Sequence, residues 1–163
     1  DPKNILQVIF ELGSAAGMNG MVLGQWIDLQ STGRDTIDAN QMEAIHENKT
    51  GALITASVRI GGILGQATST ELQCLTEYGK KVGLAFQIMD DLLDILGEEE
   101  ALGKSVGQDH LKEKWTYPRL VGLRKAKQEA NKLATSALAA LDSFGCEANP
   151  LRWIAHYTIN RKN

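Results

Sequence analysis

The most informative segment of the sequence is residues 87–94, which reads Gln87-Ile88-Met89-Asp90-Asp91-Leu92-Leu93-Asp94. It sets three carboxylates and an amide in a segment that otherwise has the apolar composition of a buried helix. Because successive helical residues are about 100° apart, Asp94, Gln87 and Asp91 fall about 40°, 60° and 100° from Asp90. We therefore expect all four on one narrow face of a largely buried helix, capped by Thr68 or Ser69 and ended by Gly97.

The three carboxylates repel one another, most strongly where water is scarce. No lysine or arginine lies within four residues of Asp90 or Asp91 in the sequence. A hard divalent cation is one answer, since Mg²⁺ takes carboxylate and phosphate oxygens as ligands. A narrow solvent-facing stripe on an ordinary core helix is the other, and the spacing alone leaves both open.

Length and composition favour a single all-α domain. The 163 residues are enough for a core, and long periodic segments with only three prolines predict helices. A net charge of −3 gives no basic surface, so we expect no nucleic-acid partner. The two cysteines give no disulfide framework, which favours reduced thiols in the cytoplasm. Each apolar segment is interrupted by Lys, Asp or Glu, so we expect no stable membrane insertion.

Two helices are predicted before the acidic one. The first runs from Pro2 to about Gly17, capped by Asp1, with an apolar side formed by Ile5, Val8, Ile9 and Leu12. In the segment that follows it, Gln25 and Asp28 would share a helix face. The second runs from about Asp38 to Leu64 and carries Lys49 inside its apolar stripe. That lysine either snorkels to an edge or is held by anions in the interior.

Polar residues after the acidic helix allow two interpretations. Lys104 and Lys114 are either solvated or form a clamp for a ligand phosphate. Thr116 is predicted to cap a long helix, and a last helix spans about Pro150 to Asn160. The three histidines form no zinc-binding pattern, so each is expected to be a surface or packing residue. They are His46, His110 and His156.

Four motifs in this order resemble a known family over nearly all of the chain. They are Lys49-Thr50-Gly51-Ala52-Leu53, then Phe86-Gln87-Ile88-Met89-Asp90-Asp91-Leu92-Leu93-Asp94, then Leu102-Gly103-Lys104 with Gly107-x-Asp109, and Lys114-x-Thr116-Tyr117-Pro118. The sequence resembles the trans-isoprenyl diphosphate synthases of the polyprenyl synthetase family, in particular the bacterial farnesyl or geranylgeranyl diphosphate synthases. Gly24-Gln25-x-x-Asp28 resembles the same family.

The resemblance implies an all-α, isoprenoid-synthase-like helical bundle of which residues 1–163 are the C-terminal portion. It implies a Mg²⁺-dependent, head-to-tail condensation of an allylic diphosphate with isopentenyl diphosphate, in a cytoplasmic homodimer. By resemblance, Lys49, Thr50 and Gln87 are catalytic, and Lys49, Lys104 and Lys114 bind the diphosphate. The metal ligands would be Asp90, Asp91 and Asp94, with Asp109 supporting the water shell of the metal.

The family's first aspartate-rich motif is not in this sequence, nor are its residues that bind isopentenyl diphosphate. The chain alone is therefore expected to be catalytically incomplete. A terpene cyclase is one alternative, because such enzymes also carry Asp-Asp-x-x-Asp, although Lys-Thr-Gly and Lys-x-Thr-Tyr-Pro argue against it. A non-catalytic helical subunit of a prenyltransferase is another.

Overall fold

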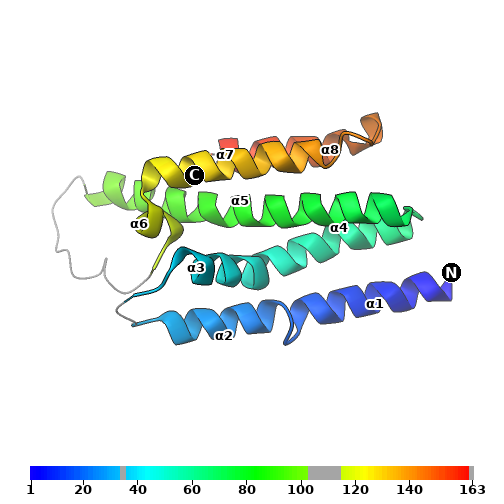
Figure 1. Cartoon of the computed structure of the whole chain (residues 1–163), viewed down its shortest axis with the longest axis horizontal. Coiled ribbons are helices and arrows are strands. Elements are labelled where there is room, and N and C mark those ends of the chain that lie inside the picture. Colours follow the sequence, from blue (N-terminus) through cyan, green and yellow to red (C-terminus); the bar gives the residue numbers. More distant parts are fainter. Residues whose placement is uncertain (34–35, 103–114, 162–163) are drawn as a thin grey trace.

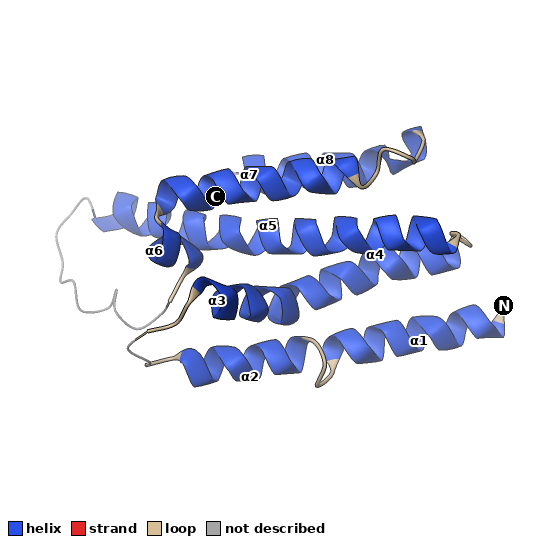
Figure 2. Ribbon diagram, in the orientation of Figure 1, coloured by secondary structure: helices blue, strands red, loops and turns tan. Residues whose placement is uncertain are grey.

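The structure, a computed structural model, describes residues 1–33, 36–102 and 115–161, and within them every regular element is a helix (Figure 2). The predicted all-α fold is thus confirmed. The helices are α1 (Pro2–Ala16), α2 (Met21–Ser31), α3 (Ala39–His46), the π turn η1 (Glu47–Gly51), α4 (Ala52–Leu64), α5 (Ser69–Leu102), α6 (Tyr117–Val121), α7 (Leu123–Ala139), the short 3₁₀ turn η3 (Cys146–Ala148) and α8 (Asn149–Asn160).

The long helix α5 runs through the middle of the bundle (Figure 1). It packs against α7 and α8 on one side and against α4 and the π turn on the other. The pair α1 and α2 lies outside α4 and the π turn, which it contacts along its length. The acidic stretch 87–94 is therefore central in the molecule.

Helix α5 begins as predicted but ends later. Thr68 and Glu71 form a reciprocal cap, with Glu71 N–H donating to Thr68 Oγ1 over 3.3 Å and Thr68 N–H donating to Glu71 Oε2 over 2.7 Å. The helix does not stop at Gly97 but continues to Leu102. One glycine costs a helix only about 1 kcal/mol, and the glutamates, alanine and leucine that follow are good helix formers.

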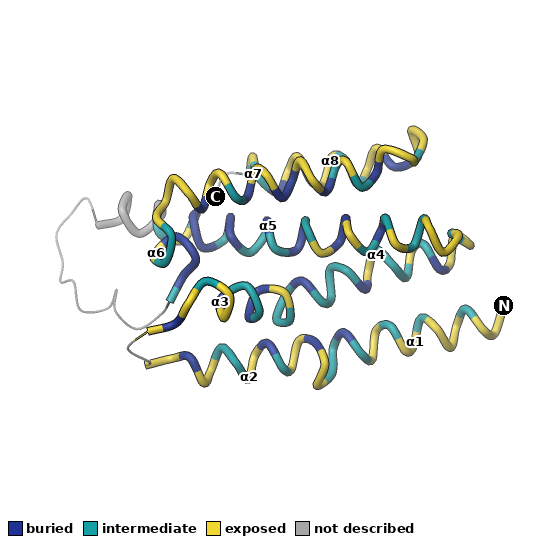
Figure 3. Tube along the Cα trace, in the orientation of Figure 1, coloured by how far each residue is buried: buried dark blue, intermediate teal, exposed yellow. Residues whose placement is uncertain are grey.

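Two clusters of buried side chains surround α5 (Figure 3). One lies near its acidic end and joins α3, α6 and α7; the other lies near its start and joins α7 and α8. Tyr78 is 1% exposed in the second cluster and donates its hydroxyl proton to Leu151 O over 2.6 Å. The first cluster includes Met42, Ile88, Met89, Leu92, Tyr117, Ala130 and Leu133, and the second Leu75, Tyr78, Val82, Ala137, Leu141 and Ala155.

Two predicted helices are interrupted. The segment from Asp38 to Leu64 is helical throughout but widens into a π turn at Glu47–Gly51. Such turns are rare inside helices and are frequent at functional sites. The long helix predicted after Thr116 is broken at Gly122, whose φ of 89° and ψ of 146° suit glycine.

The outer helix α1 packs through a face that shares only Val8 with the predicted one. Ala15 is buried, whereas Ile5, Ile9 and Leu12 are 57%, 61% and 51% exposed. The packed face instead follows Val8 and Ala15 together with a charged residue, Glu11, which forms an ion pair with α4.

By length and composition alone, Pro2–Ser31 is apolar enough to cross a membrane, although Lys3, Glu11 and Asp28 interrupt it as expected. Core helices of soluble proteins pass the same test, but only 11% of the apolar window is buried here. This segment is divided by a turn between α1 and α2, and both helices form ion pairs with the rest of the bundle.

Candidate active site

The π turn directs Thr50 toward α5. The Thr50 hydroxyl donates a hydrogen bond to Gln87 Oε1 over 2.8 Å, which joins two predicted catalytic residues 37 positions apart. The backbones approach closely here, because a Cβ built on Gly83 would lie 2.8 Å from Gly51 Cα. Small residues on both helices therefore allow the hydrogen bond to form.

Lys49 is held by an anion. Its Nζ donates to Asp28 Oδ2 over 2.6 Å, and the two side chains are 36% and 26% exposed. Each of the two alternatives for this lysine holds in part: it has a charged partner, supplied by the predicted polar face of α2, but it lies at a partly exposed position and not in the interior. Gln25 on the same helix is exposed. Since Lys49 is still partly open to solvent, it can also contact an anionic ligand.

Asp90 lies beside a cation that the sequence did not indicate. Arg161, just after α8, bonds to the Asp90 carboxylate and to Phe86 O over 3.0 Å, and its guanidinium lies 4.0 Å from the centroid of the Phe86 ring. Burial raises the pKa of Asp90, Arg161 opposes that rise, and the carboxylates of Asp94 and Asp91 add to it. This carboxylate therefore needs positive charge near it.

Asp91 does not share the face of Asp90. Its side chain is 7% exposed and turns toward α3 and α6, where Oδ2 lies 3.4 Å from His46 Nε2 and accepts the Tyr117 N–H over 2.8 Å. Asp94 is exposed. The prediction of one shared face was wrong for Asp91, because 100° around this helix separates the partly exposed side with Asp90 from the buried side with Asp91.

No metal-binding group is formed in the part of the chain that the structure describes, where no three Asp, Glu, His or Cys side chains converge. The metal roles of Asp90, Asp91 and Asp94 stay predictions. The predicted positions Lys104, Asp109 and Lys114 lie outside the described residues, so their roles stay predictions too.

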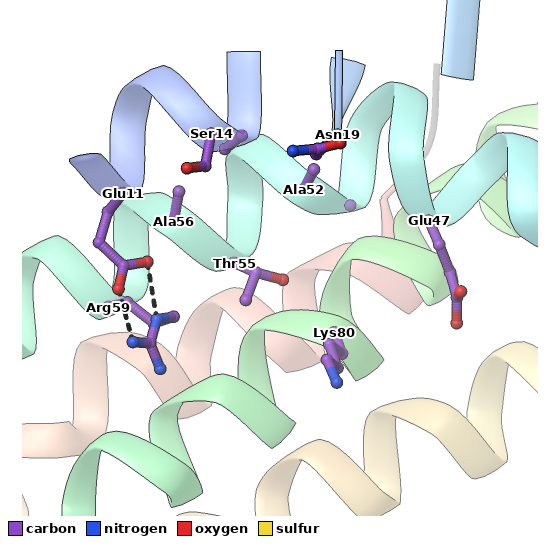
Figure 4. A pocket seen from close by; sticks show the side chains of 11 residues that line it. Glu11, Ser14, Asn19, Glu47, Ala52, Thr55, Ala56, Arg59 and Lys80 are labelled. Carbon is purple, nitrogen blue, oxygen red and sulfur yellow. Dashed lines mark hydrogen bonds and ion pairs between the residues drawn. The ribbon is translucent and has the colours of Figure 1, made fainter. Parts of the chain in front are cut away.

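A cavity of about 290 Å³ lies beside the π turn, between α1, α4 and α5 (Figure 4). Gly51, on the π turn, forms part of its wall, and Lys80 of α5 another part. At one end Arg59 forms a two-point ion pair with Glu11, over 2.8 and 2.6 Å, and its third nitrogen donates to Thr76 over 2.5 Å. This pair could not be foreseen from the sequence, because the partners are 48 residues apart.

The chain is similar to known proteins along most of its length. A family model described as polyprenyl synthetase matches residues 7–147. The chain is 43% identical to a farnesyl diphosphate synthase of Haemophilus influenzae, covering 97% of this chain and 54% of that protein. It is 39% identical to a chloroplastic geranylgeranyl pyrophosphate synthase of Capsicum annuum, covering 99% of this chain and 44% of that one.

A solved structure shows the same fold. The crystal structure of a geranyltransferase from Helicobacter pylori, complexed with magnesium and isoprenyl diphosphate, matches with a TM-score of 0.76 at 30% identity. The match covers 98% of this chain and 52% of the other. The chain thus has the helical architecture of the isoprenoid synthases and spans about half the length of the relatives it matches. With a family model matching most of its residues, the chain belongs to the polyprenyl synthetase family.

Proposed function

We propose that this chain forms part of a Mg²⁺-dependent prenyltransferase that condenses an allylic diphosphate with isopentenyl diphosphate head to tail, giving farnesyl or geranylgeranyl diphosphate. The observation that carries most weight is the hydrogen bond between Thr50 and Gln87, one helical turn from Asp90. Residues 1–163 would be the C-terminal portion of the domain. A cytoplasmic location and a homodimer are part of the same proposal and rest on the sequence resemblance.

Asp90 fits a divalent cation by its chemistry. It is a carboxylate, its side chain is 36% exposed, and its position already accommodates a guanidinium. Burial and neighbouring carboxylates both raise its pKa, so a nearby cation stabilises its charged form. Exposed Asp94, one turn further on, could join it. Bound Mg²⁺ would stabilise the negative charge of the departing diphosphate.

The residues of the chain itself would bind and orient the substrate. Lys49 can contact a diphosphate oxygen, because its ammonium is tethered by Asp28 and yet partly exposed. Thr50 and Gln87 hold each other in place, which keeps their oxygen dipoles fixed beside a developing allylic cation. Fixed dipoles stabilise such a charge without having to reorganise.

The test is an assay of the full-length gene product with Mg²⁺ and both diphosphates. We expect a longer prenyl diphosphate from the wild type, and a loss of about 100-fold or more in kcat/KM for Lys49→Ala and Asp90→Asn. Lys132→Ala, at an exposed side chain on α7, is the matched control and should stay within about twofold.

Each alternative function has its own outcome. Cyclic hydrocarbon products would favour a terpene cyclase. A full-length protein that binds neither diphosphate would favour a non-catalytic subunit. The chain 1–163 alone should show no turnover, and turnover by it would contradict the proposed incompleteness.

A further inference from the structure

A second polar cluster lies behind the candidate site, in the core between α3, α5 and α6. His46, Asp91 and Thr116 are 4%, 5% and 7% exposed as whole residues. Tyr117 borders them and donates its hydroxyl proton to Glu43 Oε1 over 3.3 Å. Polar groups this deeply buried are costly unless they bond to one another, so this cluster needs a structural or functional reason.

Asp91 supplies the cap that α6 otherwise lacks. Thr116 occupies the N-cap position of α6, but its side chain makes no capping hydrogen bond. The free N–H of Tyr117 instead donates to Asp91 Oδ2 over 2.8 Å. A buried N–H without an acceptor costs about 1–3 kcal/mol, so the Asp91 carboxylate stabilises the start of α6 by accepting this hydrogen bond.

The same carboxylate oxygen also contacts the residue that precedes the π turn. His46 is the last residue of α3 and directly precedes η1, and its Nε2 lies 3.4 Å from Asp91 Oδ2. Thr50, which donates to Gln87, stands four residues further along the chain. Asp91 therefore joins α5 to the π turn at one side and to α6 at the other.

The neighbouring carboxylate, that of Asp90, contacts a different part of the molecule. The Asp90 side chain is 36% exposed and contacts Arg161 after α8, whereas the Asp91 side chain is 7% exposed and contacts α3 and α6. We propose that Asp91 and His46 are positioning residues that hold the π turn with Thr50 against Gln87, and that Asp91 is not a metal ligand. This inference rests on the proposed function for its catalytic consequence.

Substitution by asparagine distinguishes a carboxylate that positions the π turn from one that binds a metal ion. In Asp91→Asn the side-chain carbonyl can still accept the Tyr117 N–H, as asparagine does at helix caps, so this variant should preserve positioning where Asp91→Ala does not. A metal ligand that loses its charge keeps little affinity for a hard cation. Asp90→Asn is therefore the matched control for Asp91→Asn, with the same chemistry one residue away.

The experiment titrates Mn²⁺ in the presence of inorganic diphosphate, with free Mn²⁺ measured by electron paramagnetic resonance on the full-length protein. We expect Asp90→Asn to weaken Mn²⁺ binding at least about tenfold and Asp91→Asn to stay within about threefold. Turnover should fall about tenfold or more in Asp91→Ala and recover to within about threefold in Asp91→Asn. His46→Gln, which keeps an N–H donor, should likewise retain more turnover than His46→Ala.

Hydrogen exchange at the Tyr117 amide gives a readout that needs no metal. Exchange should be faster in Asp91→Ala than in the wild type and close to the wild type in Asp91→Asn. Loss of Mn²⁺ affinity in Asp91→Asn equal to that of Asp90→Asn would overturn the inference, as would unchanged exchange in Asp91→Ala. A wild type that binds no Mn²⁺ with diphosphate would instead overturn the proposed function, and the exchange measurement would then decide the anchoring role by itself.

Discussion

Gly24 of α2 lies directly against the backbone of Lys49 in the π turn. A Cβ built on Gly24 would stand 2.1 Å from Lys49 N and 2.6 Å from Lys49 Cα, closer than any side chain can approach. This contact brings Asp28, one turn further along α2, within 2.6 Å of Lys49 Nζ. The position of the candidate catalytic lysine thus depends on a residue without a side chain.

Gly24→Ala should lower the free energy of unfolding by about 1–3 kcal/mol, because α2 must move away from the π turn. Urea unfolding measures this loss. Gly61→Ala is the control, since a Cβ on Gly61 within α4 would meet nothing within 4 Å. This substitution should raise the free energy of unfolding by about 0.5–1 kcal/mol, because alanine favours a helix more than glycine does. Equal stabilities of the two variants would contradict the backbone contact.

The ion pair between Glu11 and Arg59 should give a pH-dependent share of the stability. Hydrogen bonds from Arg59 lower the pKa of Glu11 below its ordinary 4.5. The folded state therefore favours the charged carboxylate, and this stabilisation is present above pH 4.5 and is lost as the pH falls through the lower pKa of the folded state. Glu11→Gln should cost about 1–2 kcal/mol at pH 7, with the difference from wild type shrinking below pH 4.5.

The control for that measurement is Glu129→Gln, which removes an i,i+3 pair whose lysine, Lys132, is 73% exposed. It should change the unfolding free energy at pH 7 by less than about 0.5 kcal/mol. A constant difference between Glu11→Gln and wild type from pH 7 to pH 3 would refute the role given to the charge.

Arg161 should stabilise the bundle by stacking on an aromatic ring as well as through its charge. Its guanidinium bonds to Asp90 and lies over the Phe86 ring. Arg161→Ala should cost about 1–3 kcal/mol, and Arg161→Lys should recover only part of this, since an ammonium is not planar and cannot stack on the Phe86 ring. Arg124→Ala, at an exposed position of α7, should remain within about 0.5 kcal/mol, and full recovery by Arg161→Lys would count against the stacked contact.

Tyr78 should make the protein sensitive to alkali. Burial raises its pKa to about 12, above the ordinary 10. The folded state holds the proton that the unfolded chain releases, so this stabilisation is complete below pH 10 and declines as the pH rises toward 12. Tyr78→Phe should cost about 1 kcal/mol at pH 7 by removing the hydrogen bond to Leu151 O, and its stability should fall less steeply above pH 10 in denaturation curves.

Local sequence patterns predicted the helices well where a cap or a period defined them. The cap at Asp1 and the start of α5 at Thr68 were confirmed, since both depend on residues within one turn. The π turn could not be foreseen, because it reflects how α3 and α4 fit against α2 and α5. The break at Gly122 was missed because the apolar period continues across it.

Within the site, Thr50 and Gln87 were paired by resemblance and then found in contact. His46 and Arg161 were not expected there. His46 lies between Ile45 and Glu47 and, from the sequence, could be any surface or packing histidine, because its partner Asp91 is far away in the sequence. Arg161 follows an ordinary amphipathic helix, and no periodicity distinguishes it from a solvated arginine. Only the tertiary arrangement separates these residues from their surroundings.

The π turn at Glu47–Gly51 restricts where residues can be inserted into this chain or deleted from it. Deleting one residue there would restore regular α-helical spacing and rotate everything that follows by about 100°. Arg59 would then face away from Glu11, and Thr50 away from α5. We therefore expect insertions and deletions to be tolerated between helices but not inside this five-residue segment, although a deletion there would improve its helical geometry.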